Sequence, residues 1–168
     1  MAKLLRQFRI TKALPPCAGG ASRSESVARG LARLPARAKW VLIHDGARPC
    51  LRPALVARAV QAARRSGAVA CGLPASVTVK ETSRTGRVRR TLNRERLWFV
   101  QTPQVFRRDW LEAAMRRAGR RLGRFPDDAS LVEAAGFPVT MIAGDPLNVK
   151  ITTSEDLRLA EAALRMRR

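Results

Sequence analysis

The sequence predicts an α/β fold in which helices cover both faces of a sheet, giving three layers. Short apolar runs rich in β-branched residues alternate with longer segments of helical periodicity, which is typical of βαβ units. A single polar hairpin interrupts this alternation, and its strands are too polar for a buried sheet. The chain has 168 residues, 46% of them hydrophobic, so we expect one domain with a buried core.

Five segments carry apolar residues at helical spacing: residues 24–34, 53–66, 108–118, 127–135 and 152–166. Their ends have typical boundary residues, such as Gly67 directly after the second segment. Ser24 or Ser26 is expected to cap the first helix. Thr152 with Glu155 is expected to form a capping box on the last one.

Three apolar runs predict buried strands: residues 40–44, 68–74 and 137–144. The first two flank a helix, so they form a βαβ unit, which implies a parallel sheet and a right-handed crossover. Residues 75–97 differ, because polar and apolar residues alternate on both sides of Ser83–Gly86. This pattern predicts a hairpin, which we interpret as an exposed β-arm. Trp98 and Phe99 are expected to return the chain to the core.

Residues 1–18 show no clear period, and we interpret them as a leader or loop before a domain over residues 19–168. No run of about 18 apolar residues occurs, so no membrane span is expected. Arg6, Arg9 and Lys12 interrupt the first apolar stretch, which makes it a poor secretory signal. We therefore expect a cytoplasmic protein. The 3 cysteines form no CxxC pair, so neither a disulfide framework nor a zinc site is indicated.

The formal net charge is +20, and almost all basic residues are Arg. A field of this sign suits nucleic acid or a small polyanionic substrate. The arginines are spread along the whole chain, and with 5% aromatics and no Tyr there are few platforms for stacking bases. Nucleic acid is therefore not the expected main partner, and a basic nucleic-acid-binding module is kept as an alternative.

The segment HDGARP (44–49) is the strongest candidate for chemistry. Ligands in an open parallel sheet bind beyond the carboxyl ends of the strands, where Asp45 is expected. A carboxylate there can hold Mg²⁺ together with phosphate oxygens. Gly46 would let a ligand approach the backbone, and Arg48 offers a fork for a phosphate. A solvent-exposed turn is the alternative, and His44 is expected to be a hydrogen-bonded strand-end residue rather than a catalytic one.

A second candidate is Lys150, in the segment NVK between a predicted strand and a predicted helix. A lysine there can stabilise negative charge that develops on a phosphoryl group. An exposed, solvated lysine is the alternative. The chain uses only 5 lysines among its 33 basic residues, so a lysine at this position is notable.

Seven segments occur in the order of a known family: GGASRSESVARGL (19–31), HDGARPC (44–50), LPASVTVK (73–80), NRERLWFVQTPQVF (93–106), DDAS (127–130), GFP (136–138) and NVKITTSEDL (148–157). They resemble the signature segments of 4-diphosphocytidyl-2-C-methyl-D-erythritol synthases, the cytidylyltransferases of the non-mevalonate isoprenoid pathway. The resemblance covers about residues 19–168. HDGARP, QTPQ and NVKIT at these distances form a specific combination.

The resemblance implies that the chain joins CTP and 2-C-methyl-D-erythritol 4-phosphate and releases pyrophosphate, with Mg²⁺ or another divalent cation as cofactor. It also implies a Rossmann-like three-layer nucleotidyltransferase fold. A homodimer would form by exchange of the β-arm at 75–97. The reaction is an in-line attack on the α-phosphorus of CTP, so two anions must be brought together and cations are the central requirement.

The resemblance also implies roles for residues that would touch the acceptor substrate. Asp45 would bind Mg²⁺ and help to position the substrate. Arg48 and Thr78 would contact the methylerythritol part. Arg94 would reach the substrate phosphate in the partner subunit, with Thr102 nearby.

Three further positions are implied to act on the nucleotide or on the reaction. Gly20 and Ser26 would lie beside the cytosine, and Gly46 would also belong to the nucleotide-binding residues. Lys150 would stabilise the transition state of phosphoryl transfer.

One departure from the family pattern concerns the loop that binds the nucleotide. The family begins with a strand and a Gly-rich loop of the form AAGxGxR, which wraps the triphosphate, and nothing in residues 1–18 matches it. Gly46 and Asn93 stand where the family more often has Ala and Asp. One preorganised donor is typically worth about 10²–10³ in rate, so we expect weak or no activity from this polypeptide alone. A catalytically inactive truncated remnant that still dimerises is therefore a second alternative.

Overall fold

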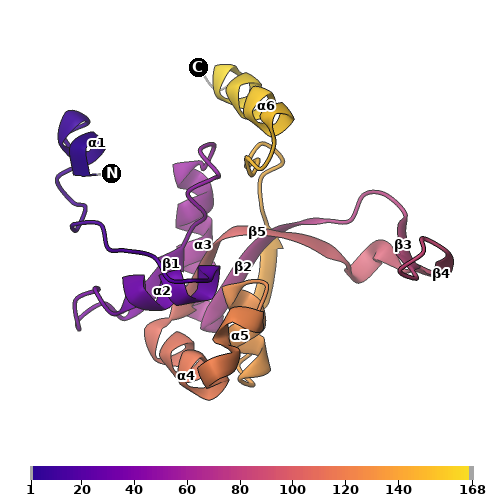
Figure 1. Ribbon diagram of the computed structural model, residues 1–168, viewed down its shortest axis with the longest axis horizontal. Helices are drawn as coiled ribbons and strands as arrows, with labels where there is room; N and C mark the ends of the chain where they lie inside the picture. Colours follow the sequence, from indigo (N-terminus) through magenta and orange to yellow (C-terminus); the bar gives the residue numbers. More distant parts are fainter. Residues whose placement is uncertain (1, 167–168) are drawn as a thin grey trace.

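A four-stranded mixed sheet forms the centre of the computed structural model, which describes residues 2–166 (Figure 1). In the order in which they lie side by side, the strands are β1 (Trp40–Ile43), β5 (Trp98–Arg107), β2 (Ala68–Pro74) and β6 (Thr140–Ala143). β5 is antiparallel to both of its neighbours, and β2 is parallel to β6. β1, β2 and β6 therefore run in one direction, and their carboxyl ends lie along the same edge of the sheet.

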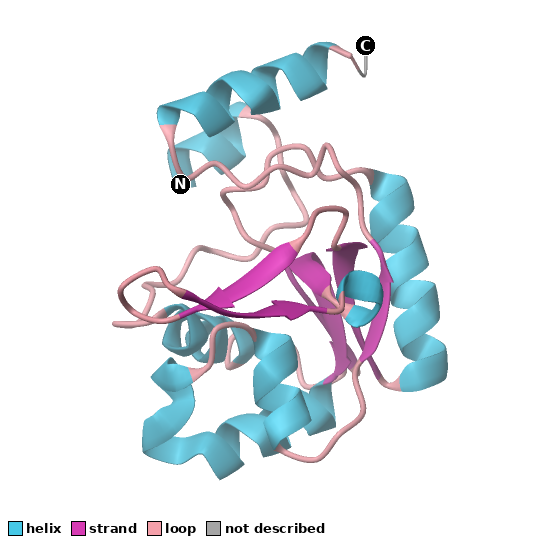
Figure 2. Cartoon of the chain, turned by 90° about the vertical axis from the view of Figure 1, so that its right-hand side faces the viewer, coloured by secondary structure: helices cyan, strands magenta, loops and turns pink. Residues whose placement is uncertain are grey.

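Helices cover both faces of this sheet, which confirms the predicted three layers (Figure 2). On one face lies α3 (Pro53–Ser66), and on the other lie α2 (Arg23–Leu31), α4 (Arg108–Ala118) and α5 (Asp128–Ala134). Neighbouring side chains of a strand point to opposite faces, so Val69 packs in the α3 layer while Ala68 and Ala70 pack in the other. Two separate apolar cores result, one on each side of the sheet.

The central strand β5 was not predicted, and it corrects two expectations. β1 and β2 are parallel, as the βαβ pattern predicts, but β5 lies between them, so the sheet is mixed rather than wholly parallel. Trp98 and Phe99 do not return to the core, because Trp98 is only partly buried and Phe99 is 52% exposed. The buried part of the strand begins at Gln101, and from Gln104 onward β5 is paired with β1 on one side and β2 on the other.

The predicted hairpin is present as a separate two-stranded antiparallel sheet of β3 (Val79–Thr82) and β4 (Val88–Leu92). The short helix η1 (Arg94–Arg96) follows it and leads into β5. This arm, residues 75–97, projects away from the body of the molecule (Figure 1). At its base, the Ala75 N–H donates to the Leu97 carbonyl over 2.9 Å, so the two ends of the arm lie together.

Two helix starts differ by a few residues from the prediction. Ser22, rather than Ser24 or Ser26, caps α2 by accepting from the Glu25 N–H. On α6 (Ser154–Arg165), Thr153 and Asp156 form the capping box that was assigned to Thr152 and Glu155. In both cases several hydroxyl residues lie within a few positions of one another, so local spacing does not decide which one has extended backbone.

The remaining elements lie at the periphery. A short helix, α1 (Ala2–Gln7), occurs in the segment interpreted as a leader or loop, and η2 (Gly119–Arg124) follows α4. Ala160 and Ala163 of α6 pack on Cys50, in the loop after β1. None of the helices within residues 2–166 is long and apolar enough to cross a membrane.

Candidate active site

A pocket of about 710 Å³ lies at the carboxyl ends of the parallel strands. Asp45 and Arg48 enter it from the loop after β1, and Lys150 enters from the loop after β6. Arg23, from the start of α2, completes a group of three cations around one carboxylate. The structure thus brings together the two loops that the sequence singled out.

Asp45 is the centre of this group. Its Oδ1 accepts a hydrogen bond from Arg23 Nε at 3.2 Å, and its Oδ2 lies 3.4 Å from Lys150 Nζ and 3.6 Å from Arg48 Nε. Burial favours the neutral acid, but the hydrogen bond and charge of Arg23 and the charge of Lys150 outweigh it, so the pKa of Asp45 lies below its usual value. Asp45 is therefore ionised at neutral pH and is held by cations on both of its oxygens.

The loop that carries Lys150 is anchored on both sides of the lysine. The buried Asn148 side chain donates to the Thr102 carbonyl at 2.7 Å, and its own carbonyl accepts from Arg48 Nη1 at 2.7 Å. The Ile151 N–H donates to the Ala47 carbonyl at 2.8 Å. Lys150 is thus fixed against the loop after β1, while its side chain is still 44% exposed to the pocket. The sequence offered no signal for the anchoring role of Asn148.

Arg48 is nearly enclosed, with a side chain that is 10% exposed. Burial lowers the pKa of its guanidinium, and the charge of Asp45 offsets this only in part. Three buried side-chain atoms have no hydrogen-bond partner among residues 2–166, namely Arg48 Nε, Asp128 Oδ1 and Asn148 Oδ1. All three lie in or beside the group of charges around Asp45.

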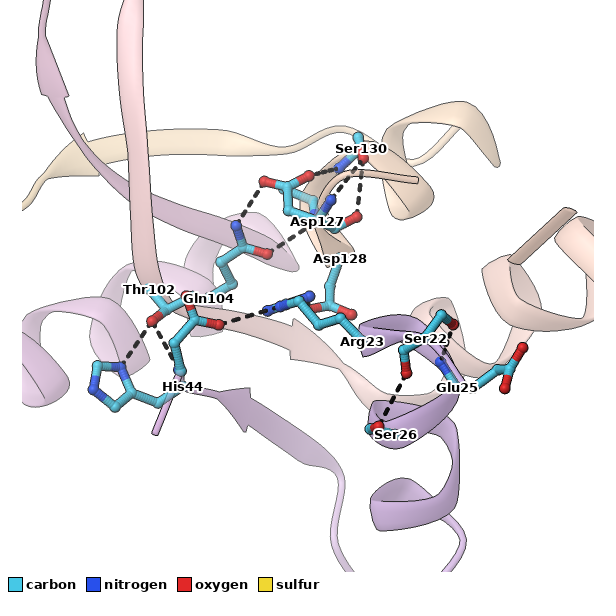
Figure 3. A network of polar contacts seen from close by, with 12 residues as sticks. Ser22, Arg23, Glu25, Ser26, His44, Thr102, Gln104, Asp127, Asp128 and Ser130 are labelled. Carbon is cyan, nitrogen blue, oxygen red and sulfur yellow. Dashed lines mark hydrogen bonds and ion pairs between the residues drawn. The ribbon is translucent and has the colours of Figure 1, made fainter. Parts of the chain in front are cut away.

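Thr102 joins β5 to the loop after β1 (Figure 3). Its hydroxyl accepts from the Asp45 N–H at 3.0 Å and lies 3.0 Å from His44 Nδ1. The other ring nitrogen of His44 is 3.1 Å from the Arg48 carbonyl. Both nitrogens of His44 are therefore engaged, as expected for a structural strand-end histidine, and Thr102 fixes the backbone at Asp45.

Arg23 and Asp128 are site residues to which the sequence gave no role. Arg23 Nη1 lies 2.7 Å from Asp128 Oδ2, and the Asp128 side chain is 0% exposed (Figure 3). Burial raises the pKa of the Asp128 carboxyl, and the charge and hydrogen bond of Arg23 offset this only in part. The adjacent pair Asp127–Asp128 was a possible signal, because one carboxylate is enough to cap a helix and the second is left for another purpose.

α5 is tied to the sheet by Gln104 of β5. The fully buried Gln104 side chain donates to Asp127 Oδ2 at 2.8 Å and accepts from the Ala129 N–H at 3.0 Å. Asp127 in turn caps α5 through the Ser130 N–H. β5 therefore fixes the loop after β1 through Thr102 and the start of α5 through Gln104 (Figure 3).

The predicted substrate residues Thr78 and Arg94 do not line this pocket. Both lie on the arm, and Arg94 Nη1 donates to the Ser76 carbonyl at 2.8 Å. Thr78 is exposed directly before β3. Within a single chain, then, the structure leaves these two residues apart from Asp45.

The predicted nucleotide-binding residues occupy two places. The Gly20 N–H donates to Ser26 Oγ at 2.9 Å, which links these two residues at the start of α2 but outside the pocket lining. A side chain at Gly20 would overlap Glu25, so the close approach of the chain requires glycine here. Gly46 is exposed beside Asp45, with open space around the position of a Cβ atom.

A second groove, of about 740 Å³, lies at the other end of β1 and β5 beside Trp40 and Trp110. Two of its basic residues, Arg107 and Arg108, are paired with Asp109 and Glu112. None of the predicted site residues lines it. The two pockets are similar in volume, so volume does not indicate which one is the active site. We take the pocket at Asp45 as the candidate active site because the charged loops converge there.

Asp45 can serve a divalent cation only in the company of a phosphorylated ligand. Within residues 2–166, no group of three or more His, Cys, Asp or Glu side chains could hold a metal ion. Mg²⁺ is commonly held by one or two carboxylates together with substrate phosphates. Three neighbouring cations would repel a bare metal ion, whereas a bound phosphate would reverse the sign of the local charge. The donor set therefore fits Mg²⁺ together with phosphate oxygens.

The comparisons with known proteins agree with one another. Residues 2–166 match the family model described as 2-C-methyl-D-erythritol 4-phosphate cytidylyltransferase. A relative of that name from Dehalococcoides mccartyi is 44% identical over 163 residues, which cover 97% of this chain and 70% of the relative. The crystal structure of such a protein from Thermus thermophilus has a TM-score of 0.80 at 38% identity, covering 96% of this chain and 86% of the other. A 4-diphosphocytidyl-2C-methyl-D-erythritolsynthase structure from Anaerococcus prevotii has a TM-score of 0.85 at 27% identity, covering 99% and 77%.

The fold and the phosphate-suited site at its strand ends define an α/β nucleotidyltransferase. The match to the family model spans nearly the whole chain, and the relative from Dehalococcoides is well above the similarity at which a shared fold is expected. The chain belongs to the 2-C-methyl-D-erythritol 4-phosphate cytidylyltransferase family. This confirms the resemblance that the ordered sequence segments predicted.

Proposed function

We propose that this chain transfers a cytidylyl group from CTP to 2-C-methyl-D-erythritol 4-phosphate and releases pyrophosphate, in non-mevalonate isoprenoid biosynthesis. The observation that carries the proposal is the contact between Asp45 and Lys150, which lie 3.4 Å apart across one pocket. Family membership supplies the substrates, and the pocket supplies the charges that their phosphates require.

Lys150 is placed to act on the reacting phosphates. Its ammonium is held near Asp45 but is 44% exposed, so a phosphate oxygen can approach it without displacing the loop. The negative charge that develops during in-line transfer would then meet a fixed cation that needs no reorganisation. Arg48, fixed by the Asn148 carbonyl, would offer its guanidinium to the acceptor substrate.

Asp45 would position the acceptor substrate and hold Mg²⁺ together with phosphate oxygens. When bound, the ion would neutralise phosphate charge and polarise the phosphoryl group. The chain's own contribution is to keep the Asp45 carboxylate ionised and oriented, through Arg23 on one oxygen and through Lys150 and Arg48 on the other.

The arm would complete the site in a homodimer. Thr78 and Arg94 lie on the arm and away from the pocket of their own chain, which supports a role at the pocket of a partner subunit. Val77 and Val88 of the arm are exposed, as expected of a surface that a second copy covers. The cytoplasm is the compartment we propose for this enzyme.

The test is pyrophosphate release with CTP, Mg²⁺ and 2-C-methyl-D-erythritol 4-phosphate. We expect weak turnover, because residues 1–18 do not match the Gly-rich loop of the family, and Lys150→Ala should lower it further by about 10²-fold or more, because one fixed electrostatic donor is typically worth that much. Lys39→Ala, at an exposed lysine outside the pocket, is the matched control and should keep the wild-type rate. Equal rates for Lys150→Ala and wild type would overturn the role of Lys150.

The same preparation separates the alternatives. A folded dimer without CTP-dependent turnover would favour the inactive remnant. Binding to nucleic acid whose log affinity falls steeply with log salt would favour the basic binding module.

A further inference from the structure

Asp128 is unusually deeply buried for a carboxylate in the first turn of a helix. Its side chain is 0% exposed, one carboxylate oxygen is bound by Arg23, and the other has no hydrogen-bond partner among residues 2–166. The helix does not need it as a cap, because Asp127 and Ser130 already form the capping box. Burying a carboxylate costs free energy unless it is paired, so its presence needs a reason other than the stability of α5.

Arg23 supplies that reason, because it bridges two carboxylates. Nη1 contacts Asp128 Oδ2 at 2.7 Å, with both residues labelled in Figure 3, and Nε contacts Asp45 Oδ1 at 3.2 Å. The guanidinium is planar and rigid, so fixing one edge on a buried partner also fixes the direction of its other N–H groups. The backbone of Arg23 is itself fixed as the first residue of α2, after the Ser22 cap.

We infer that Asp128 and Arg23 are positioning residues that lock the rotation of the Asp45 carboxylate. With Oδ1 tied to Arg23, Oδ2 is directed at Lys150 and Arg48, where the phosphates are proposed to bind. Asp128 lies behind Arg23 and lines no part of the pocket, so its effect on the reaction passes through the bridge. The expected effect on turnover rests on the proposed function, whereas the bridge between Asp128, Arg23 and Asp45 does not depend on it.

The bridge makes arginine irreplaceable by lysine. A lysine ammonium is a single donor point, whereas the two contacts of Arg23 come from different nitrogens of the fork. Arg23→Lys should therefore behave like Arg23→Ala although the charge is kept. Asp128→Asn keeps the size of the side chain and removes only its charge.

The first measurement is turnover. We expect Asp128→Asn and Arg23→Lys each to lower kcat/KM about tenfold or more, since an ångström-scale displacement of a reacting group can cost about 10²-fold. In an Asp45→Asn background, adding Asp128→Asn should change the residual rate by less than about twofold, because coupled residues are not additive. A merely structural role predicts the same loss in both backgrounds, and that result would overturn the inference.

The second measurement needs no activity. The Arg23 Nε–H should give a protected signal in ¹H–¹⁵N spectra, assigned by its loss in Arg23→Lys. We expect this signal to shift or broaden in Asp128→Asn. It should stay unchanged in Glu133→Gln, which removes an exposed charge from the same helix and keeps both contacts of Arg23.

The two measurements test different claims, so a negative result in one does not decide the other. An unchanged Arg23 signal in Asp128→Asn would overturn the bridge, whatever the turnover. A wild-type chain without turnover would count against the proposed function, and the spectra would still decide whether Asp128 holds Arg23.

Discussion

Asp45 and Asp128 bind the same guanidinium, that of Arg23, yet their carboxyl pKa values are displaced in opposite directions. Asp128 is fully buried and Asp45 is partly buried, and burial opposes ionisation in each. For Asp45, the hydrogen bond and charge of Arg23 together with the charge of Lys150 outweigh burial, so its pKa is lowered. For Asp128, deep burial is offset only in part by Arg23, and the charges of Asp127 and Asp45 add to it, so its pKa is raised. Arg23 thus binds one carboxyl group whose ionised form is favoured, that of Asp45, and one whose ionised form is disfavoured, that of Asp128.

This difference predicts opposite pH slopes for two variants. A lowered folded-state pKa gives stability that is present above the unfolded pKa of about 3.9 and is lost as pH falls, so the advantage of wild type over Asp45→Asn should grow with rising pH. A raised folded-state pKa gives stability that is present below the unfolded pKa and is lost as pH rises through the folded pKa, so the stability of wild type relative to Asp128→Asn should fall with rising pH above about 3.9. Urea unfolding from about pH 2 to 7 measures both slopes, because the Asp45 change falls mainly below about pH 4 and the Asp128 change above it. Slopes of the same sign would contradict the assignment.

Among the glycines that directly follow a helix, Gly67 should be the one whose substitution lowers the stability of the fold most. Its φ is +87°, and a Cβ there would overlap the ring of Trp110, which stacks on Phe137. Gly67→Ala should lower the free energy of unfolding by about 2–5 kcal/mol, from backbone strain together with overpacking. Urea unfolding provides the measurement.

Gly86→Ala is the matched control for that prediction. Gly86 has φ +80° but open space around it, so only the backbone cost of about 1–2 kcal/mol applies. Equal losses for the two variants would show that Trp110 yields to the new methyl group.

Removing the arm should separate the proposed dimer without unfolding the domain. Residues 77–92 can be replaced by a short Gly-Ser linker, because the Ala75 N–H bonds to the Leu97 carbonyl at the base of the arm. Light scattering should give a dimer for the wild type and a monomer for the shortened chain. A shortened chain that still dimerises would place the interface elsewhere.

Thiol reactivity should distinguish the three cysteines. Cys17 is exposed, whereas Cys50 and Cys71 are buried, and burial raises the pKa of the Cys71 thiol to about 11. A chromogenic disulfide reagent at about pH 8 should therefore label one thiol quickly in the native state and all of them in denaturant, since the thiolate is the reactive form. Cys17→Ser should abolish the fast phase, and a fast phase that persists would show that a buried thiol is accessible.

Sequence patterns predicted α2 to α6 and three of the four central strands, because their apolar periodicity is local, but not α1. They missed β5, since Gln101, Thr102, Pro103 and Gln104 interrupt its apolar run. The three polar residues among them are buried, and two of them hold the site together: Thr102 bonds to Asp45 and Gln104 bonds to the start of α5. A buried strand whose side chains form hydrogen bonds around a pocket is more polar than a strand that packs only in an apolar core.

The candidate site was predicted where a motif stood at a strand end, and missed where a residue acts through another. Asp45 and Lys150 were both singled out and do meet. Asn148, Arg23 and Asp128 acquire their roles only from partners far along the chain, such as the 105-residue separation of Arg23 and Asp128. No local spacing encodes such a pairing.

β5 also restricts how members of this family can vary in length. It leaves the arm at Trp98 and, within ten residues, carries both Thr102 and Gln104 on the pocket side. Inserting or deleting one residue inside the strand would turn those side chains to the opposite face. Insertions and deletions should therefore be tolerated at the hairpin tip and excluded from 102–107, where the two side chains and the pairing with β1 lie, however freely the arm itself diverges.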